Sequence, residues 1–175
     1  MELSPLTQQK KYHIWALGCQ MNKSDAQRLA TKLESLGYQE ALSQEEAHFI
    51  AAVACSVRQS AMDRIFGKAK TWNAWKQKRP LVTALTGCVL PNDRPKMRPA
   101  FDIFFDINDL EQLGDKIVQK EHALENINPR SDYFRIRPKH SSTFQGFVPI
   151  MTGCNHYCTY CAVPLTRGKE ISRTA

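Results

Sequence analysis

Short apolar segments alternate with amphipathic ones along the first two thirds of the chain, and this alternation limits the possible folds most strongly. Four segments are typical of buried strands: residues 12–17, 48–53, 81–85 and 101–106. After three of them, apolar residues recur at spacings of three and four, which predicts helices. Because strands that alternate with helices form parallel sheets with helices on their faces, we predict an α/β fold. Its amino-terminal parallel-sheet domain is expected to span residues 1–125.

The helix predicted after the first strand carries its apolar residues on one face. They are Ala26, Leu29, Ala30, Leu33 and Leu36. We expect Ser24 or Asp25 to cap the start of this helix, because short polar side chains satisfy the free amides there. Gly37 suits the other end, where a helix commonly closes with a left-handed residue.

The remaining third of the chain has a different pattern. Residues 126–145 are polar, contain Pro129 and Pro138, and show no periodicity, so we interpret them as a linker. A short strand at 147–151 opens a second unit over residues 146–175. Those 30 residues suffice for about one βαβ unit. The second unit is therefore expected to be only the beginning of a larger domain.

The charge balance is basic, with 24 Lys and Arg against 17 Asp and Glu and a net charge of +7. Residues 130–175 alone hold seven basic and two acidic side chains. This suits a nucleic acid as partner; the basic stretch 135–139 would contact phosphates or would be a solvated linker. The sequence has neither the roughly 18 apolar residues of a membrane helix nor an apolar signal segment at its start. We therefore expect a soluble, cytoplasmic protein without membrane association.

Three of the six cysteines follow the predicted strands. Cys19, Cys55 and Cys88 each lie just past the carboxyl end of one strand. Since those ends share one edge of a parallel sheet, where open α/β folds bind ligands, we expect the three thiols to converge. Gly18 and Gly87 beside them would let a bulky cofactor approach the backbone. Three thiolates suit an iron–sulfur cluster with one open iron, or zinc with an open position; three separate buried thiols are the alternative.

The other three cysteines form a CxxxCxxC motif, made of Cys154, Cys158 and Cys161. A reducing cytoplasm disfavours disulfides, so thiols at this spacing indicate metal ligation or redox chemistry. Close spacing on one loop places three thiolates around a single ion or cluster. A zinc knuckle that lacks its fourth ligand has the same spacing, and His156 is a poor candidate for that ligand because it lies between two cysteines.

Four motifs together resemble a known family. They are LGCQMNKSDA (17–26), ACSVR (54–58), TGCV (86–89) and TGCNHYCTYCAVPLTRGKEISR (152–173). In order and spacing they are similar to the methylthiotransferase family of radical S-adenosylmethionine (radical SAM) enzymes. The GCQMN motif resembles that of the branch that acts on isopentenylated adenosine in tRNA. By this resemblance, the chain would be an amino-terminal fragment of such an enzyme. Sister branches act on threonylcarbamoyl-adenosine in tRNA or on a ribosomal protein.

The resemblance implies two 4Fe-4S clusters and S-adenosylmethionine as cofactors. It assigns Cys19, Cys55 and Cys88 to an auxiliary cluster, and Cys154, Cys158 and Cys161 to the radical SAM cluster. No catalytic residue is implied beyond these ligands, and Arg167 of the TRG element is expected near the radical cluster. Residues 146–175 would be the truncated start of a radical SAM (β/α) barrel.

The resemblance also implies a function, which is the methylthiolation of tRNA at C2 of isopentenylated adenosine. The implied partners are tRNA and an electron donor such as flavodoxin or ferredoxin, and we expect a monomer. Because almost all of the barrel is missing, the isolated chain is expected to be inactive. The alternative function is a non-catalytic metal-binding module associated with RNA, which would hold one metal site instead of two clusters.

Overall fold

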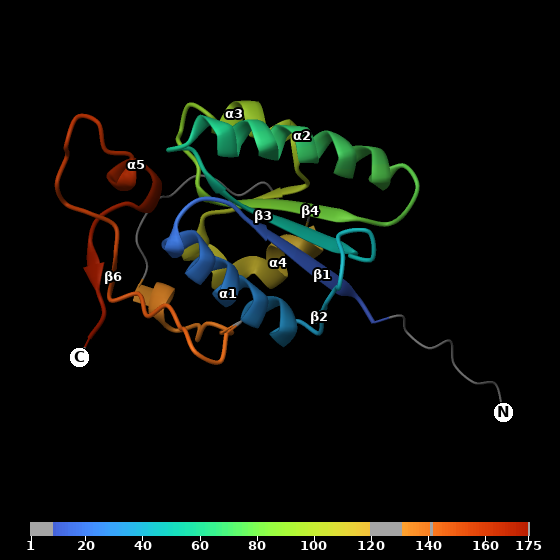
Figure 1. The fold of residues 1–175 in the computed structure, drawn as a ribbon, viewed down its shortest axis with the longest axis horizontal. Helices are drawn as coiled ribbons and strands as arrows, with labels where there is room; N and C mark the ends of the chain where they lie inside the picture. Colours follow the sequence, from blue (N-terminus) through green and yellow to red (C-terminus); the bar gives the residue numbers. More distant parts are fainter. Residues whose placement is uncertain (1–8, 120–130, 141, 175) are drawn as a thin grey trace.

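The structure, a computed structural model, describes residues 9–119, 131–140 and 142–174. Its centre is a parallel sheet of five strands in the order β2-β1-β3-β4-β5 (Figure 1). The strands are β1 (Lys11–Ala16), β2 (Gln39–Glu40), β3 (Phe49–Cys55), β4 (Val82–Cys88) and β5 (Ile103–Phe104). The predicted α/β class and its four strands are confirmed. The short edge strand β2 was not among the predicted elements.

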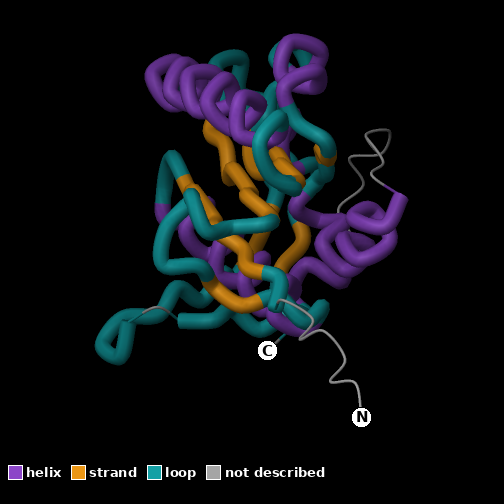
Figure 2. The backbone as a smooth tube through the Cα atoms, turned by 90° about the vertical axis from the view of Figure 1, so that its right-hand side faces the viewer, coloured by secondary structure: helices purple, strands orange, loops and turns teal. Residues whose placement is uncertain are grey.

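Helices cover both faces of the sheet (Figures 1 and 2). α2 (Gln59–Lys76) and α3 (Arg94–Met97) lie on one face, and α1 (Gln20–Ser35) and α4 (Leu113–Gln119) lie on the other. The described residues also include three short 3-10 helices: η1 (Arg98–Ala100), η2 (Ile107–Gln112) and η3 (Ser131–Phe134). None of the helices within the described ranges is long and apolar enough to cross a membrane.

Strand β3 explains why the core has two halves. All seven of its residues are buried, and successive side chains of a strand point to opposite faces. Phe49, Ala51 and Val53 pack into the core under α1, together with Leu29 and Leu33. The residues between them, Ile50, Ala52 and Ala54, pack with Trp72 into the core under α2. A strand buried on both faces must be apolar along its whole length, as this one is.

The first helix begins earlier than predicted. α1 starts at Gln20, directly after Cys19, and Ser24 and Asp25 lie inside it and are buried. The prediction that either residue caps the helix is therefore wrong. The reason is Asn22, whose side-chain amide donates to the Leu17 carbonyl at 2.7 Å and to the Ala54 carbonyl at 2.6 Å. These bonds fix the first helical turn at the strand end, without a local cap.

Part of the predicted linker packs along α1. The Lys139 amide donates to the Gln27 carbonyl at 3.1 Å, and the Thr31 hydroxyl donates to the Arg137 carbonyl at 2.8 Å. Tyr133 is buried in the core under α1. Residues 126–130 and 141 of the predicted linker lie outside the described residues, as does the predicted boundary at residue 125. The domain limits therefore stay predictions.

The last described segment, residues 142–174, contains β6 (Met151–Thr152), α5 (Val163–Arg167) and β7 (Ile171–Ser172). β6 and β7 pair antiparallel, so of the predicted strand 147–151 only Met151 is in a strand. The part of the segment from β6 to β7 lies at the left of Figure 1, at the edge where β1, β3 and β4 end. An antiparallel pair is not the parallel unit that opens a (β/α) barrel, so the start of a barrel stays a prediction.

Candidate functional site

The three cysteines of the sheet domain lie at one edge of the sheet. Cys19 occupies the N-cap of α1 just after β1, while Cys55 and Cys88 are the last residues of β3 and β4 and pair in the strand register. A Cβ placed on Gly18 would lie 2.7 Å from the Cys55 Cβ, so the turn before Cys19 passes directly over Cys55. Cys19 is exposed, and the other two are buried.

Asn22 lies between two of these thiols. Its Oδ1 accepts from the Cys19 thiol at 3.9 Å and from the Cys88 thiol at 3.7 Å. The amide nitrogen of the same side chain is occupied by two backbone carbonyls, which fixes the oxygen toward the sulfur atoms. Asn22 is completely buried. It is thus a shared polar neighbour of the thiols.

Gly87 at the site is required by close packing between two strands. At Gly87, where φ is +98°, an added Cβ would lie 2.7 Å from the Ala54 carbonyl oxygen and 2.8 Å from its nitrogen. The close approach is therefore between β4 and the backbone of β3, one residue before Cys88. The packing of the two strands alone therefore requires a glycine at position 87, and the approach of a cofactor there stays a prediction.

A buried cluster of charges lies next to the thiols. Asp25, which has no solvent exposure, accepts from Arg28 at 2.6 Å, from the Tyr133 hydroxyl at 2.9 Å and from Arg167 at 2.6 Å. The Arg28 guanidinium also stacks on the Tyr133 ring, 3.5 Å from its centroid. One carboxylate thus faces two guanidinium groups. The cluster carries an excess positive charge in a region removed from water.

Arg167 connects this cluster to Cys88. Its Nε donates to the Cys88 sulfur at 3.1 Å, and its Nη2 donates to the Asn22 oxygen at 3.3 Å as well as to Asp25. Burial raises the pKa of the Cys88 thiol above its ordinary value, and the charge of Arg167 opposes that effect. The sequence placed Arg167 near the second cysteine triplet; the structure places its side chain at the first.

The second cysteine triplet lies on the loop between β6 and α5. Cys158 is exposed, and Cys154 and Cys161 are half-buried. The His156 amide donates to the Cys154 sulfur at 3.4 Å, and the Cys161 amide donates to the Cys158 carbonyl at 3.0 Å. Because Arg167 ends the helix that follows this loop, its contact with Cys88 brings the loop to the same edge of the sheet as the first triplet.

The arrangement of the cysteines bears on whether they could hold a metal or a cluster. In the described parts of the chain, no group of three or more His, Cys, Asp or Glu side chains is arranged to hold a metal ion. Arg167, whose Nε contacts Cys88, nevertheless has a buried Nη1 with no hydrogen-bond partner, and buried polar groups normally have one. A thiol beside a cationic donor with a free hydrogen is the chemistry that an iron–sulfur cluster would use, because a cluster carries sulfur acceptors.

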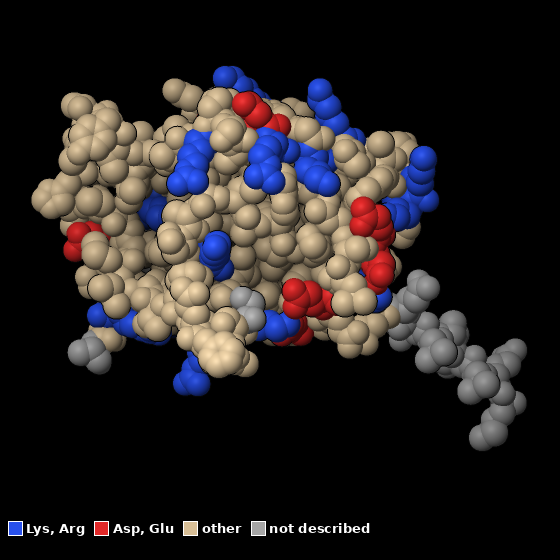
Figure 3. Space-filling model, in the orientation of Figure 1, with Lys and Arg blue, Asp and Glu red and all other residues tan. Residues whose placement is uncertain are grey.

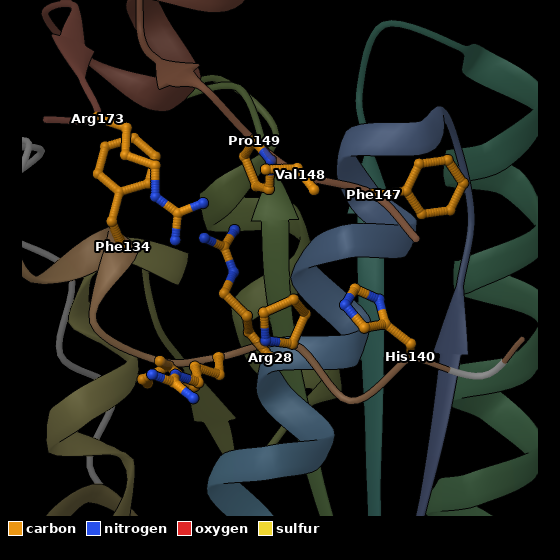
Figure 4. Close-up of a pocket in the computed structure, with 10 residues that line it drawn as sticks. Arg28, Phe134, His140, Phe147, Val148, Pro149 and Arg173 are labelled. Atoms are coloured by element: carbon orange, nitrogen blue, oxygen red, sulfur yellow. The ribbon is translucent and has the colours of Figure 1, made fainter. Parts of the chain in front are cut away.

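A second feature is a basic pocket of about 330 Å³ on the α1 side. It is lined by Arg28, Phe134, Ile136, Arg137, Pro138, His140, Phe147, Val148, Pro149 and Arg173. Figure 4 shows the guanidinium groups of Arg28 and Arg173 pointing toward one another, with the Arg173 group 5.9 Å from the Phe134 ring centroid. No acidic side chain is among these lining residues, so the pocket presents cations and aromatic faces.

Comparison with known families decides where the chain belongs. The model of a family described as "Uncharacterized protein family UPF0004" matches residues 11–105, which are more than half of the chain. The matched residues include all five strands of the parallel sheet. The chain belongs to UPF0004. The matched part of this UPF0004 chain contains Cys19, Cys55 and Cys88 together with Asn22 and Asp25.

Curated relatives of the UPF0004 chain carry the name tRNA-2-methylthio-N(6)-dimethylallyladenosine synthase. The chain is 36% identical over 177 residues to the protein of Yersinia pseudotuberculosis, 37% over 174 to that of Yersinia enterocolitica, and 35% over 174 to that of Actinobacillus succinogenes. Each match covers 94% of this chain and 37% of the relative. The predicted family resemblance is confirmed, and the chain spans about 37% of the length of these relatives.

Sequence reasoning missed the polar residues around the thiols, Asn22, Asp25 and Arg28. A signal for them was available. Asn22 and Asp25 lie seven and four residues before Leu29, on the stripe of the helix that faces the core. Polar residues on an apolar stripe indicate a buried network, because burial without partners costs free energy.

Proposed function

We propose that this UPF0004 chain forms the auxiliary-cluster domain and the start of the radical SAM domain of a cytoplasmic tRNA methylthiotransferase. The reaction is methylthiolation at C2 of isopentenylated adenosine, the branch to which the names of the relatives point. The observation that carries the proposal is the position of Cys19, Cys55 and Cys88 at one sheet edge, with Asn22 between the Cys19 and Cys88 thiols. The unpartnered Nη1 of Arg167 supports it, because a cluster sulfur there would accept its hydrogen bond.

The roles of the residues follow from their positions. Cys19, Cys55 and Cys88 would hold the auxiliary 4Fe-4S cluster, with the exposed Cys19 on the open side and the two buried thiols beneath. Cys154, Cys158 and Cys161 would hold the second cluster, where S-adenosylmethionine binds. When bound, these groups would supply the sulfur and the one-electron chemistry, and the protein would position them and exclude water. A flavodoxin or ferredoxin would deliver the electrons.

Counting iron tests the proposal. After anaerobic reconstitution, the parent chain is expected to contain about eight irons and an equal amount of acid-labile sulfide. The triple variants Cys19→Ala/Cys55→Ala/Cys88→Ala and Cys154→Ala/Cys158→Ala/Cys161→Ala are each expected to retain about four, because each removes the ligands of one 4Fe-4S cluster. His156→Ala is the matched control; it changes the second loop without removing a thiol and should keep all eight.

Three other outcomes of this experiment are informative. Zinc in place of iron would contradict the proposal and favour the non-catalytic metal-binding module. A parent with four irons that are lost only with the first triplet would restrict the proposal to the auxiliary cluster. Loss of iron in His156→Ala would contradict the ligand set given for the second loop.

The RNA contact is assigned to the basic pocket. Figure 3 shows Lys and Arg over several parts of one face, including α2, with acidic residues among them, so net charge does not single out one surface. Lys139 of the basic stretch forms ion pairs with Glu34 and Glu40, which leaves it less available for phosphate. Arg137 and Arg173 line the pocket beside Phe134 and Phe147. Guanidinium and aromatic groups together suit phosphates and unstacked bases.

The pocket leads to a salt-dependence prediction. Arg173→Gln is expected to weaken tRNA binding and to reduce the slope of log K against log salt concentration by about one, the effect of losing one phosphate contact. Fluorescence anisotropy with labelled tRNA at several salt concentrations measures it. Lys70→Gln on α2 is the control, because it removes the same charge from an exposed site on the opposite face of the sheet. Equal slopes for the two variants would contradict the assignment.

A further inference from the structure

We propose that Arg167 is a positioning residue that holds the loop of the second cysteine triplet against the first. The residue lies outside the part of the chain that the family match covers, which ends at residue 105. Its contact is with this chain's own sheet and forms without a bound cofactor. Only the claim that this contact brings two cluster sites together rests on the proposed function.

The first argument is the geometry of one guanidinium group. Arg167 is 4% exposed, and its donors contact Cys88 at the end of β4 and Asn22 and Asp25 in the first half of α1. A planar guanidinium offers several donors in a fixed fork, whereas a lysine ammonium is a single point on a flexible stem. Arginine is therefore the residue type that can fix α5 to β4 and α1 at once.

The second argument is that the cysteine loop and α5 have few other contacts with the sheet, since the pocket contacts of the segment come from Phe147, Val148, Pro149 and Arg173 outside them. Several of its large apolar side chains are exposed, among them Leu165 at 50% and Tyr160 at 91%. Its backbone hydrogen bonds are mostly internal, such as Cys154 to Gly168 and Thr166 to Ala162. Within the described residues, the side-chain bonds that join it to the sheet come from Arg167, with Thr166 beside it at Cys88.

The third argument is charge. Asp25 balances one of the two guanidinium groups that it binds, so the contact of Arg167 leaves a positive charge beside Cys88. Thiolates that ligate a metal are anionic, and a buried positive charge next to them is favourable. The docked segment therefore supplies the complementary charge at the first triplet while it holds the second triplet nearby.

Amide hydrogen exchange of the apoprotein tests the proposal. The reporters are the amides of Cys154, Thr166 and Gly168, which bond within the segment. In Arg167→Gln they are expected to exchange at least about tenfold faster, because breaking a buried ion pair raises the population of the undocked state. Arg167→Lys keeps the charge but loses the fork, and we expect an intermediate acceleration. Amides of β3 report on the sheet and should stay unchanged.

Lys169→Gln is the matched control, since it removes one positive charge from an exposed site two residues away. Equal exchange of the three reporters in Arg167→Gln and Lys169→Gln would overturn the proposal. If Arg167→Gln also accelerates the β3 amides, Arg167→Lys decides: faster reporters with an intact β3 support the role, and unchanged reporters refute it. A parent that takes up no iron but shows the exchange effect would contradict the proposed function and leave this role standing.

Discussion

Replacing Asp25 by Asn is expected to lower the free energy of unfolding by about 3–5 kcal/mol, the cost of breaking a buried ion pair from one side. Asp25 has no solvent exposure and is the carboxylate that Arg28 and Arg167 share. A neutral amide of the same shape would leave two buried guanidinium groups facing each other without an anion. Urea unfolding followed by tryptophan fluorescence measures the change.

Asp63→Asn is the control for this experiment. Asp63 is an exposed acid on α2 that accepts from Gln59, and its replacement should change the stability by less than about 0.5 kcal/mol. Similar unfolding midpoints for the Asp25 and Asp63 variants would show that the buried cluster contributes little to stability. The account of Asp25 as the centre of the cluster would then be wrong.

The second large effect is expected at Gly87. Gly87→Ala should destabilise the fold by about 2–6 kcal/mol, because a disfavoured backbone conformation and steric overlap each cost about 1–3 kcal/mol. The residue has a φ of +98°, and its added Cβ would meet backbone atoms of Ala54 in the neighbouring strand. Backbone of a central strand cannot move aside as a flexible side chain can. The loss should appear in both thermal and urea unfolding.

Gly67→Ala is the matched control, with an effect of opposite sign. Gly67 lies inside α2, has a normal helical conformation, and an added Cβ there would meet nothing within 4 Å. Alanine is the better helix former by roughly 0.5–1 kcal/mol, so this variant is expected to be more stable than the parent. Equal effects of the two substitutions would contradict the steric argument at Gly87.

The strands and the placement of the first triplet follow from local rules. The apolar runs at β1, β3 and β4 match either the two-residue alternation of a half-buried strand or the continuous apolar sequence of a fully buried strand. Because these strands are parallel, their carboxyl ends lie at one edge of the sheet. The start of α1 did not follow. Capping rules consider neighbours in sequence, whereas Asn22 fixes the first turn by bonding to Ala54, 32 residues away. A tertiary hydrogen bond replaced the local cap.

The polar half of the site was harder to predict for the same reason. Cys88 and Arg167 are 79 residues apart, and their contact depends on the path of residues 142–174, which no local sequence pattern fixes. The strand predicted at 147–151 illustrates the difficulty. Val148 and Ile150 are apolar but 65% and 70% exposed, so hydrophobicity alone overestimated the extent of regular structure there.

The shared carboxylate also imposes an order in time. Asp25 meets Arg28 within one helical turn, but Arg167 follows it only 142 residues later. At a synthesis rate of about 5–20 residues per second, roughly 7–28 s separate the two partners on the ribosome. The sheet of local βαβ units has time to form first, and the contact of Arg167 with Cys88 is made afterwards. A cluster assembled at Cys19, Cys55 and Cys88 before that moment would find the edge of the sheet still open.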